Sequence, residues 1–225
     1  MITLIKKEIT KLRERERKVK SFFVSFYAIG FIGLILPFSN PFFLKLTPYA
    51  LLLSVSALAV FHKAKIDKKL ILVLTGIFLA GFIVELIGVN GGYIFGEYRY
   101  GSGLGLKLRK TPLLIGMNWV LMVYLTANIV TRLDLSSLPS ILLSSLLMLG
   151  YDIILEQVAS YLDMWHWYDH TIPVQNYVAW FLLALIFHSV LKIFRIRTEN
   201  NLAPLLLICQ VVFFLFLLIV NKFTP

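Results

Sequence analysis

Seven long apolar stretches dominate this chain of 225 residues. Each is close to the roughly 20 residues that an α-helix needs to cross the hydrocarbon core of a bilayer. They lie at 21–38, 46–62, 70–89, 112–130, 138–160, 174–194 and 202–221. With 59% hydrophobic residues and a mean hydropathy of +0.82, they exclude an ordinary soluble domain. The runs are also too long and unbroken for barrel strands of about ten alternating residues. We therefore predict an all-α integral membrane protein, a bundle of about seven transmembrane helices.

The first 20 residues differ from the rest because they are strongly basic. Within them, apolar residues recur at helical spacing, at Ile2, Ile5, Ile9 and Leu12. We expect residues 1–20 to form a basic amphipathic segment, which lies along the membrane surface or is solvated as a charged helix. Residues 21–225 are then a single transmembrane helical domain.

The distribution of basic residues predicts the orientation of the bundle. If the chain crosses the membrane seven times, 16 of its 22 Lys and Arg residues fall on the side of the N-terminus. Short loops rich in Lys and Arg remain on the cytoplasmic side. We expect a multi-pass protein of the cell membrane with its N-terminus in the cytoplasm and its C-terminus outside. Topology and anionic membrane lipid then account for the net charge of +10, and we expect no nucleic-acid partner.

Three acidic residues interrupt the apolar stretches: Glu85, Asp152 and Glu156. A charged side chain inside a membrane costs at least a few kcal/mol, so such residues are candidates for function. Asp152 and Glu156 are four residues apart and share one helix face. In the predicted orientation all three lie at a similar depth in the outer half of the bundle.

Polar residues of other helices reach the same layer. Asn118 and Trp119 descend to it from the outer end of their helix, and Gln175 and Asn176 begin the next helix but one. The sequence therefore predicts a polar pocket in the outer leaflet. Structural alternatives remain open, because Glu85 could reach the interface and amides such as that of Asn118 commonly join membrane helices.

Two outer loops flank this layer. The first, NGGYIFGEYRYGSGLGLKLRKT, alternates aromatic residues with others, which suggests a re-entrant or hairpin-like segment that contains the candidates Glu97 and Tyr98. Its GSGLG run lacks the strand and helix that flank a phosphate-binding loop. The second loop, DMWHWYDHTIPVQN, contains the candidate Trp165, although an interfacial aromatic belt alone would explain its tryptophans.

The sequence contains little that predicts a metal or a disulfide. Cys209 is the single cysteine. His166 and His170 are four residues apart, but Pro173 makes a continuous helix through them doubtful and no compact ligand motif surrounds them. We expect neither a metal ion nor a cofactor.

Two blocks of sequence closely resemble a known family. They are GFIVELIGVNGGYIFGEYRYGSGLGLKLRKTPLLIGMNW at 81–119 and YDIILEQVASYLDMWHWYDHTIPVQNYVAWF at 151–181. Both are similar to segments of the membrane carotenoid biosynthesis proteins, typified by the CruF-type carotenoid 1,2-hydratases and the bisanhydrobacterioruberin hydratases. The second block contains the acid pair, the Trp-rich turn and a Pro-x-Gln-Asn-Tyr start of the next helix.

The resemblance implies a cofactor-independent hydratase, a hydro-lyase that adds water to the terminal C=C bond of an acyclic carotenoid. A carboxyl group removed from water favours its protonated form, and could protonate the alkene to a tertiary carbocation. We predict that Asp152 is this acid and that Glu85 and Glu156 handle water and charge. Aromatic faces at Trp119, Tyr98 and Trp165 would stabilise the cation.

The carotenoid would come from the bilayer, and neighbouring carotenoid enzymes are further candidate partners. Other functions remain open at this point. The same protonation without water capture would make a carotenoid end-group cyclase or isomerase. A lipid transporter or a noncatalytic carotenoid-binding protein would need a similar apolar groove, although not three buried acids.

Overall fold

The computed structural model describes residues 9–223, and the structural statements below concern this part of the chain. Six helices have the length and hydropathy needed to span a membrane. They are α2 (Glu16–Ile35), α5 (Lys68–Gly91), α6 (Leu114–Thr131), α7 (Ser137–Ala159), α8 (Val174–Ile193) and α9 (Ala203–Phe223). The prediction of a helical membrane bundle is confirmed.

The predicted stretch at 46–62 forms a shorter apolar helix, α4 (Thr47–Phe61), which follows the five-residue helix α3 (Asn40–Leu44). It has 15 residues, so the described structure contains six helices of spanning length in place of the seven expected. Of the predicted basic N-terminal segment, residues 1–8 lie outside the described part. Residues 9–14 are helical, and 16–20 already belong to α2.

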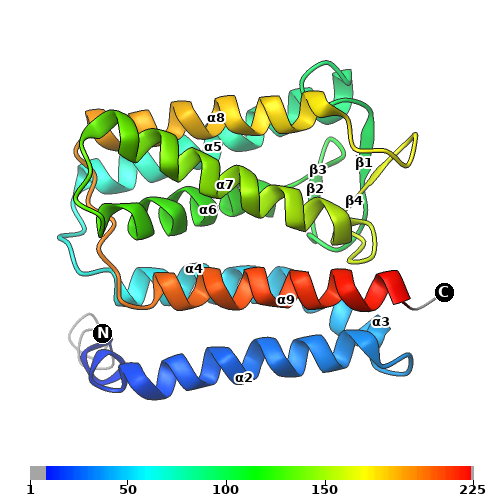
Figure 1. The fold of residues 1–225 in the computed structure, drawn as a ribbon, viewed down its shortest axis with the longest axis horizontal. Helices are drawn as coiled ribbons and strands as arrows, with labels where there is room; N and C mark the ends of the chain where they lie inside the picture. The colour runs from blue at the N-terminus through cyan, green and yellow to red at the C-terminus, as the bar shows by residue number, and fades with distance from the viewer. Residues whose placement is uncertain (1–8, 224–225) are drawn as a thin grey trace.

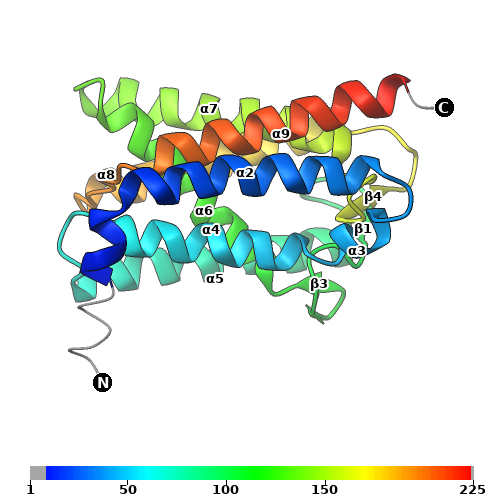
Figure 2. The ribbon, with the colours of Figure 1, turned by 90° about the horizontal axis from the view of Figure 1, so that it is seen from below.

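The long helices lie roughly antiparallel, so the bundle has two distinct ends (Figure 1). The strand end contains α3 and four short strands. The basic end contains the connections at 62–67, 132–136 and 194–202 and the start of α2. Helices α5, α6, α7 and α8 form one part of the bundle, and α2, α4 and α9 pack along it (Figure 2).

Local chemistry explains where α5 begins and ends. Its N-cap, Asp67, accepts a hydrogen bond from the Leu70 amide at 2.8 Å, as a capping carboxylate does. Its C-cap, Gly92, has a φ of 70°, the left-handed conformation that favours glycine. The helix therefore stops just before the first outer loop and leaves that loop free to turn back over the bundle.

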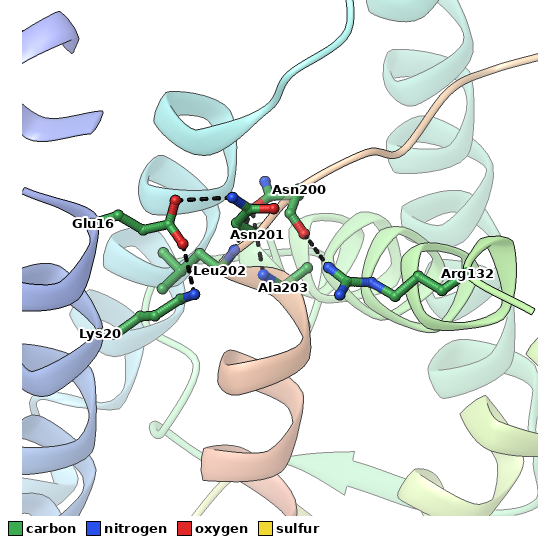
Figure 3. A network of polar contacts seen from close by, with 7 residues as sticks. All are labelled: Glu16, Lys20, Arg132, Asn200, Asn201, Leu202 and Ala203. Atoms are coloured by element: carbon green, nitrogen blue, oxygen red, sulfur yellow. Dashed lines mark hydrogen bonds and ion pairs between the residues drawn. The ribbon is translucent and has the colours of Figure 1, made fainter. Parts of the chain in front are cut away.

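Two consecutive asparagines join three helices at the basic end (Figure 3). The side chain of Asn200 accepts hydrogen bonds from the amides of Leu202 and Ala203 at the start of α9, and its carbonyl oxygen accepts one from Arg132 at 2.8 Å. Beside it, the amide of Asn201 donates to Glu16 on α2. These bonds tie α2, α6 and α9 together where the chain would otherwise expose unpaired helix-terminal groups.

The strands belong to two ribbons at the strand end. Strand β1 (Tyr98–Tyr100) pairs antiparallel with β4 (Trp165–Trp167), so the two outer loops form one structure although they are far apart in sequence. The strands β2 (Lys107–Leu108) and β3 (Thr111–Pro112) form a hairpin. The alternating aromatic run, from which a hairpin-like segment was expected, pairs instead with the other loop, and the hairpin of the first loop lies at 107–112.

A carboxylate fastens the two outer loops to each other. Asp163 accepts hydrogen bonds from both the amide and the hydroxyl group of Ser102. A Cβ atom at Gly101 or Gly103 would lie 2.2 or 2.4 Å from backbone oxygens of residues 163 and 162, so only glycine permits this approach. The glycines of the GSGLG run therefore serve loop packing.

The acidity of Asp163 follows from this contact. Its partial burial acts to raise the pKa, but the hydrogen bonds from Ser102 and His166 outweigh that effect and lower the pKa to about 2 from 3.8. The folded pKa lies below the unfolded one. The hydrogen bonds from Ser102 to Asp163 therefore contribute their full stabilisation above about pH 4, and this stabilisation is lost as the pH falls toward 2.

We predict that Asp163→Ala loosens the outer loops at neutral pH, because it removes both bonds from Ser102. Hydrogen–deuterium exchange should become faster in the amides of residues 101–105. Asp134→Ala is a matched control, since Asp134 and Asp163 both have a φ of 50° and the substitution strains both backbones equally. Equal exchange rates at 101–105 in the two variants would contradict the role of Asp163 in holding the two outer loops together.

Candidate active site

The ribbon of β1 and β4 directs four aromatic side chains toward the bundle. Tyr98 lies opposite Trp167 and Tyr100 lies opposite Trp165, while the residues between them face the other way. Alternate residues of a strand point to the same face, which explains how two short loops present two tyrosine hydroxyl groups and two indole N–H groups together. All four side chains are buried.

Two of these rings and one from α6 bind Glu85. Its Oε2 accepts hydrogen bonds from the hydroxyl groups of Tyr98 at 2.7 Å and Tyr100 at 2.6 Å, and its Oε1 accepts one from Trp119 Nε1 at 3.0 Å. Glu85 is 3% exposed. Every partner is a donor, so this surrounding favours a carboxylate acceptor.

Glu156 has an equivalent set of partners. Its Oε2 accepts from the indole nitrogens of Trp165 and Trp167, both at 2.9 Å, and its Oε1 accepts from the amide of Asn176 at 2.8 Å. An indole N–H group can only donate, so both tryptophans are the donors in these bonds and the Glu156 oxygen is the acceptor. The two loops thus supply hydrogen-bond donors to both glutamates. Tyrosines of the first loop donate to Glu85, and tryptophans of the second donate to Glu156.

A small cavity separates the two glutamates. Its volume is about 10 Å³, and its lining includes Glu85, Glu156, Asn176 and Trp180. One water molecule needs roughly 10–15 Å³ of such volume together with polar partners. The space between the carboxylates therefore matches a single water molecule in size and in chemistry.

Asp152 differs from both glutamates. It has no exposed surface, and neither carboxyl oxygen makes a hydrogen bond with the described residues. Asn176 lies nearby and donates one hydrogen bond to Glu156; the approach of its amide group to Asp152 favours the carboxylate but falls short of hydrogen-bond geometry. Asp152 is close enough to both glutamates to interact with them electrostatically. Burial of an ionised carboxylate without partners is very costly, so the surroundings favour the neutral acid at this position.

A large apolar groove lies beside the small cavity and shares Trp165 with it, and none of the three acids lines it. Its volume is about 420 Å³, within the range typical of ligand pockets. Residues of α2 and α4 form its outer side, and Tyr151, Leu155, Asn118 and Trp165 are among the residues at the site. Trp165 lines both the groove and the small cavity, so its indole ring lies between the two spaces.

The groove faces the surrounding lipid between α2 and α4. Phe22 and Ile29 of α2 line it and are 51% and 58% exposed. Both helices lie along this side of the bundle (Figure 2). A hydrophobic molecule could therefore approach the acids laterally, without crossing water.

Most of the predicted site residues lie in this region. The structure brings together eight of them. Direct hydrogen bonds or shared cavity walls join seven, and Asp152 lies beside these. The seven are Glu85, Glu156, Asn118, Trp119, Tyr98, Trp165 and Asn176. Glu97 and Gln175 lie elsewhere. Both are exposed, and Gln175 donates to the carbonyl oxygen of Tyr93 in the first outer loop.

Sequence reasoning did not include three aromatic residues of the site. Tyr100 and Trp167 donate to the glutamates, and Trp180 stacks on Trp119 with ring centroids 4.1 Å apart. The first two could have been found from the paired patterns Tyr-Arg-Tyr and Trp-His-Trp, in which strand alternation aligns the outer residues. Trp180 has no such signal, because its partner is on another helix.

The two loop histidines have separate surroundings. His166 lies in strand β4, and its Nε2 is 2.9 Å from Asp163. His170 is in a turn with a φ of 55°, so the helical spacing considered for the pair does not occur. Among the described residues, the structure contains no group of three or more His, Cys, Asp or Glu side chains placed to hold a metal ion.

Comparison with known proteins assigns the chain to a family. The sequence model described as "Carotenoid biosynthesis protein" matches residues 46–224, which include every helix from α4 onward and both outer loops. The chain belongs to the carotenoid biosynthesis protein family. It therefore has a role in carotenoid biosynthesis, and it is a multi-pass membrane protein. No curated protein and no solved structure matches the chain.

We predict that Gly81→Ala disturbs the site. A Cβ atom there would lie 2.7 Å from the indole ring of Trp119, which donates to Glu85. Overpacking of this kind typically costs about 1–3 kcal/mol, and here it also displaces a donor from a buried carboxylate. The expected result is a lower unfolding temperature in detergent and a changed tryptophan fluorescence spectrum.

Gly76→Ala is the matched control on the same helix. No heavy atom lies within 4 Å of the added methyl group, and alanine is the better helix former. This variant should be as stable as the unmodified protein or slightly more so. If both variants lowered the unfolding temperature equally, the loss would come from any glycine-to-alanine change on α5 and not from the contact with Trp119.

Proposed function

We propose that this family member is a carotenoid hydratase, which adds water to the terminal C=C bond of an acyclic carotenoid end group without a cofactor. One observation carries the proposal. A fully buried carboxyl group without hydrogen bonds from the described residues, Asp152, lies beside two glutamates that each accept three, next to an apolar groove open to lipid.

The first step would be protonation of the alkene by Asp152. A carboxyl group must hold a proton before it can donate one to a C=C bond, and unpaired burial favours that protonated form. The proton forms a C–H bond at the less substituted carbon, and the π electrons form this bond. A tertiary carbocation remains at the other carbon, and Asp152 becomes a carboxylate.

The second step would be capture of the cation by water. Glu85 and Glu156 are surrounded by donors that favour the carboxylate form, and as carboxylates they would stabilise a nearby cation without reorganisation. The water-sized cavity lies between them. A water molecule there would form the C–O bond and release one proton to a glutamate, and return of a proton to Asp152 completes the cycle. The product is a tertiary alcohol.

The groove suits the substrate expected for this reaction. A long polyene is insoluble in water and would enter from the bilayer between α2 and α4, with only its end group near the acids. Rings of Trp165, Tyr151 and Phe214 line the groove, and aromatic faces attract cations by about 0.5–2 kcal/mol each. The same surroundings keep bulk water from the carbocation.

The site would face the outer leaflet of the cell membrane. The basic end of the bundle holds most Lys and Arg residues of the connections, which favours a cytoplasmic location for that end. The strand end, with the acids near it, would then lie on the external side, and the N-terminus would be cytoplasmic.

Coexpression with a lycopene-producing pathway tests the reaction. We expect pigments whose mass has increased by one or two molecules of water in mass spectrometry. A new pigment of unchanged mass would indicate a cyclase or isomerase. No new pigment from a correctly inserted protein would contradict an enzymatic function on this substrate and favour transport or binding.

We predict that Asp152→Asn abolishes the hydrated product, because an amide cannot deliver the proton although it has almost the same shape. Membrane insertion and the unfolding temperature should stay near those of the unmodified protein. Asp134→Asn is the isosteric control in an exposed turn and should retain full conversion. Conversion by Asp152→Asn at the unmodified rate would remove Asp152 from the acid role.

We further predict that Ala50→Trp blocks access to the site. Ala50 lines the groove on α4, so an indole side chain there would fill space that the carotenoid end group needs. Product should fall at least about tenfold, as expected when a substrate is misplaced at a reacting centre. Ala59→Trp on the same helix is the control, because Ala59 is exposed and does not line the groove.

A further inference from the structure

A second cavity lies at the basic end of the bundle, far from the acids along the helix axes. Its volume is about 360 Å³, and it is bounded by α6, α7, α8 and the segment that follows α8. Hydroxyl and charged side chains form much of its wall, in contrast to the apolar groove. Part of the wall is fixed, since Asn128 donates to the carbonyl oxygen of Thr198 and Arg132 to that of Asn200 (Figure 3).

The charge in this cavity is positive. Lys192, Arg195 and Arg197 line it, against the single carboxylate of Glu199. Arg197 donates two hydrogen bonds to Glu199, so this pair is largely compensated. The side chains of Lys192 and Arg195 make no ion pair or hydrogen bond with the described residues. Two cations are therefore available to an anionic ligand.

Two serine hydroxyl groups in the cavity wall independently indicate a polar ligand. Ser140 and Ser144 lie one turn apart on α7, line the cavity, and are 3% and 2% exposed. Neither hydroxyl group makes a hydrogen bond with the described residues, whereas the adjacent Ser145 bonds the carbonyl oxygen of Ile141 in the manner usual for serine in helices. Neither oxygen is among the fully buried atoms that lack a partner, so both hydroxyl groups reach the open space of the cavity, where a ligand can accept their hydrogen bonds.

The start of α7 adds to this potential. Its N-cap, Ser136, makes no side-chain capping bond, and the first turn contains no acidic residue. The positive end of the helix dipole and its free amides are therefore uncompensated beside the cavity, where Ser137 lines the wall. Cations, hydroxyl donors and a helix N-terminus together match the chemistry of a phosphate group.

We infer that this cavity binds the phosphate group of an anionic phospholipid. A lipid is favoured over free phosphate because the cavity lies at the ends of membrane-spanning helices and its wall includes Ile141 and Leu191. Exposed apolar residues beside it, Leu138 and Ile193, can pack against acyl chains. The site is independent of the proposed hydratase reaction, and it anchors the junction of α6, α7 and α8 at the membrane surface.

Native mass spectrometry of the full chain in detergent tests this inference. Titration with phosphatidylglycerol should show one tightly bound lipid, and phosphatidylcholine should bind more weakly. In Lys192→Gln/Arg195→Gln, the affinity for phosphatidylglycerol should fall about tenfold or more, since each basic residue near an anionic lipid contributes substantially to binding. In Ser140→Ala/Ser144→Ala it should fall about tenfold or more, because two hydrogen-bond donors to the phosphate group are lost.

Lys65→Gln/Lys69→Gln is the matched control, because it removes two charges at the same end of the bundle but outside the cavity. It should leave the affinity unchanged. Equal weakening in this control and in Lys192→Gln/Arg195→Gln would overturn the site in favour of general charge attraction, as would serine variants that bind normally. Inorganic phosphate that binds as tightly as the lipid would overturn the assignment to a phospholipid. Unfolding temperatures near that of the unmodified protein confirm that each variant is folded.

Discussion

Two carboxylates buried in a membrane protein must receive hydrogen bonds from the protein itself, because no bulk water is available to solvate them. Glu85 and Glu156 each accept three such bonds, and four of the six donors come from the short ribbon that the two outer loops form. The loops are thus part of the membrane site and not mere connections. The hydrogen bonds from Ser102 to Asp163 also hold these two loops together.

This requirement separates the surroundings of the three acids. The donors that surround both glutamates favour their charged form, while Asp152 receives no comparable support from the described residues. A neutral acid beside two compensated carboxylates is a suitable arrangement for protonating an alkene and stabilising the cation that results. The family to which the chain belongs makes carotenoids, whose terminal alkenes are chemically suited to this reaction.

The two ends of the bundle have different surface chemistry. At the strand end, aromatic donors meet acids next to an apolar groove, so that end suits a neutral hydrocarbon. At the basic end, cations and serine hydroxyl groups surround a cavity without compensating acids beyond Glu199, so that end suits an anion. Three helices, α6, α7 and α8, contribute residues to both sites, and a lipid that stabilises one end would also restrain the other.

The sequence alone determined the membrane bundle, the presence of three intramembrane acids and the resemblance to the family, because long apolar runs and the cost of buried charge depend on composition and order. Only the tertiary structure decided which side chains serve which acid. Tyr100 and Trp167 reach the glutamates through pairing between strands 65 or more residues apart in sequence, and Trp180 meets Trp119 across two helices. It also placed Glu97 and Gln175 outside the cluster and made α4 short, since strand register and helix packing depend on contacts that no local pattern specifies.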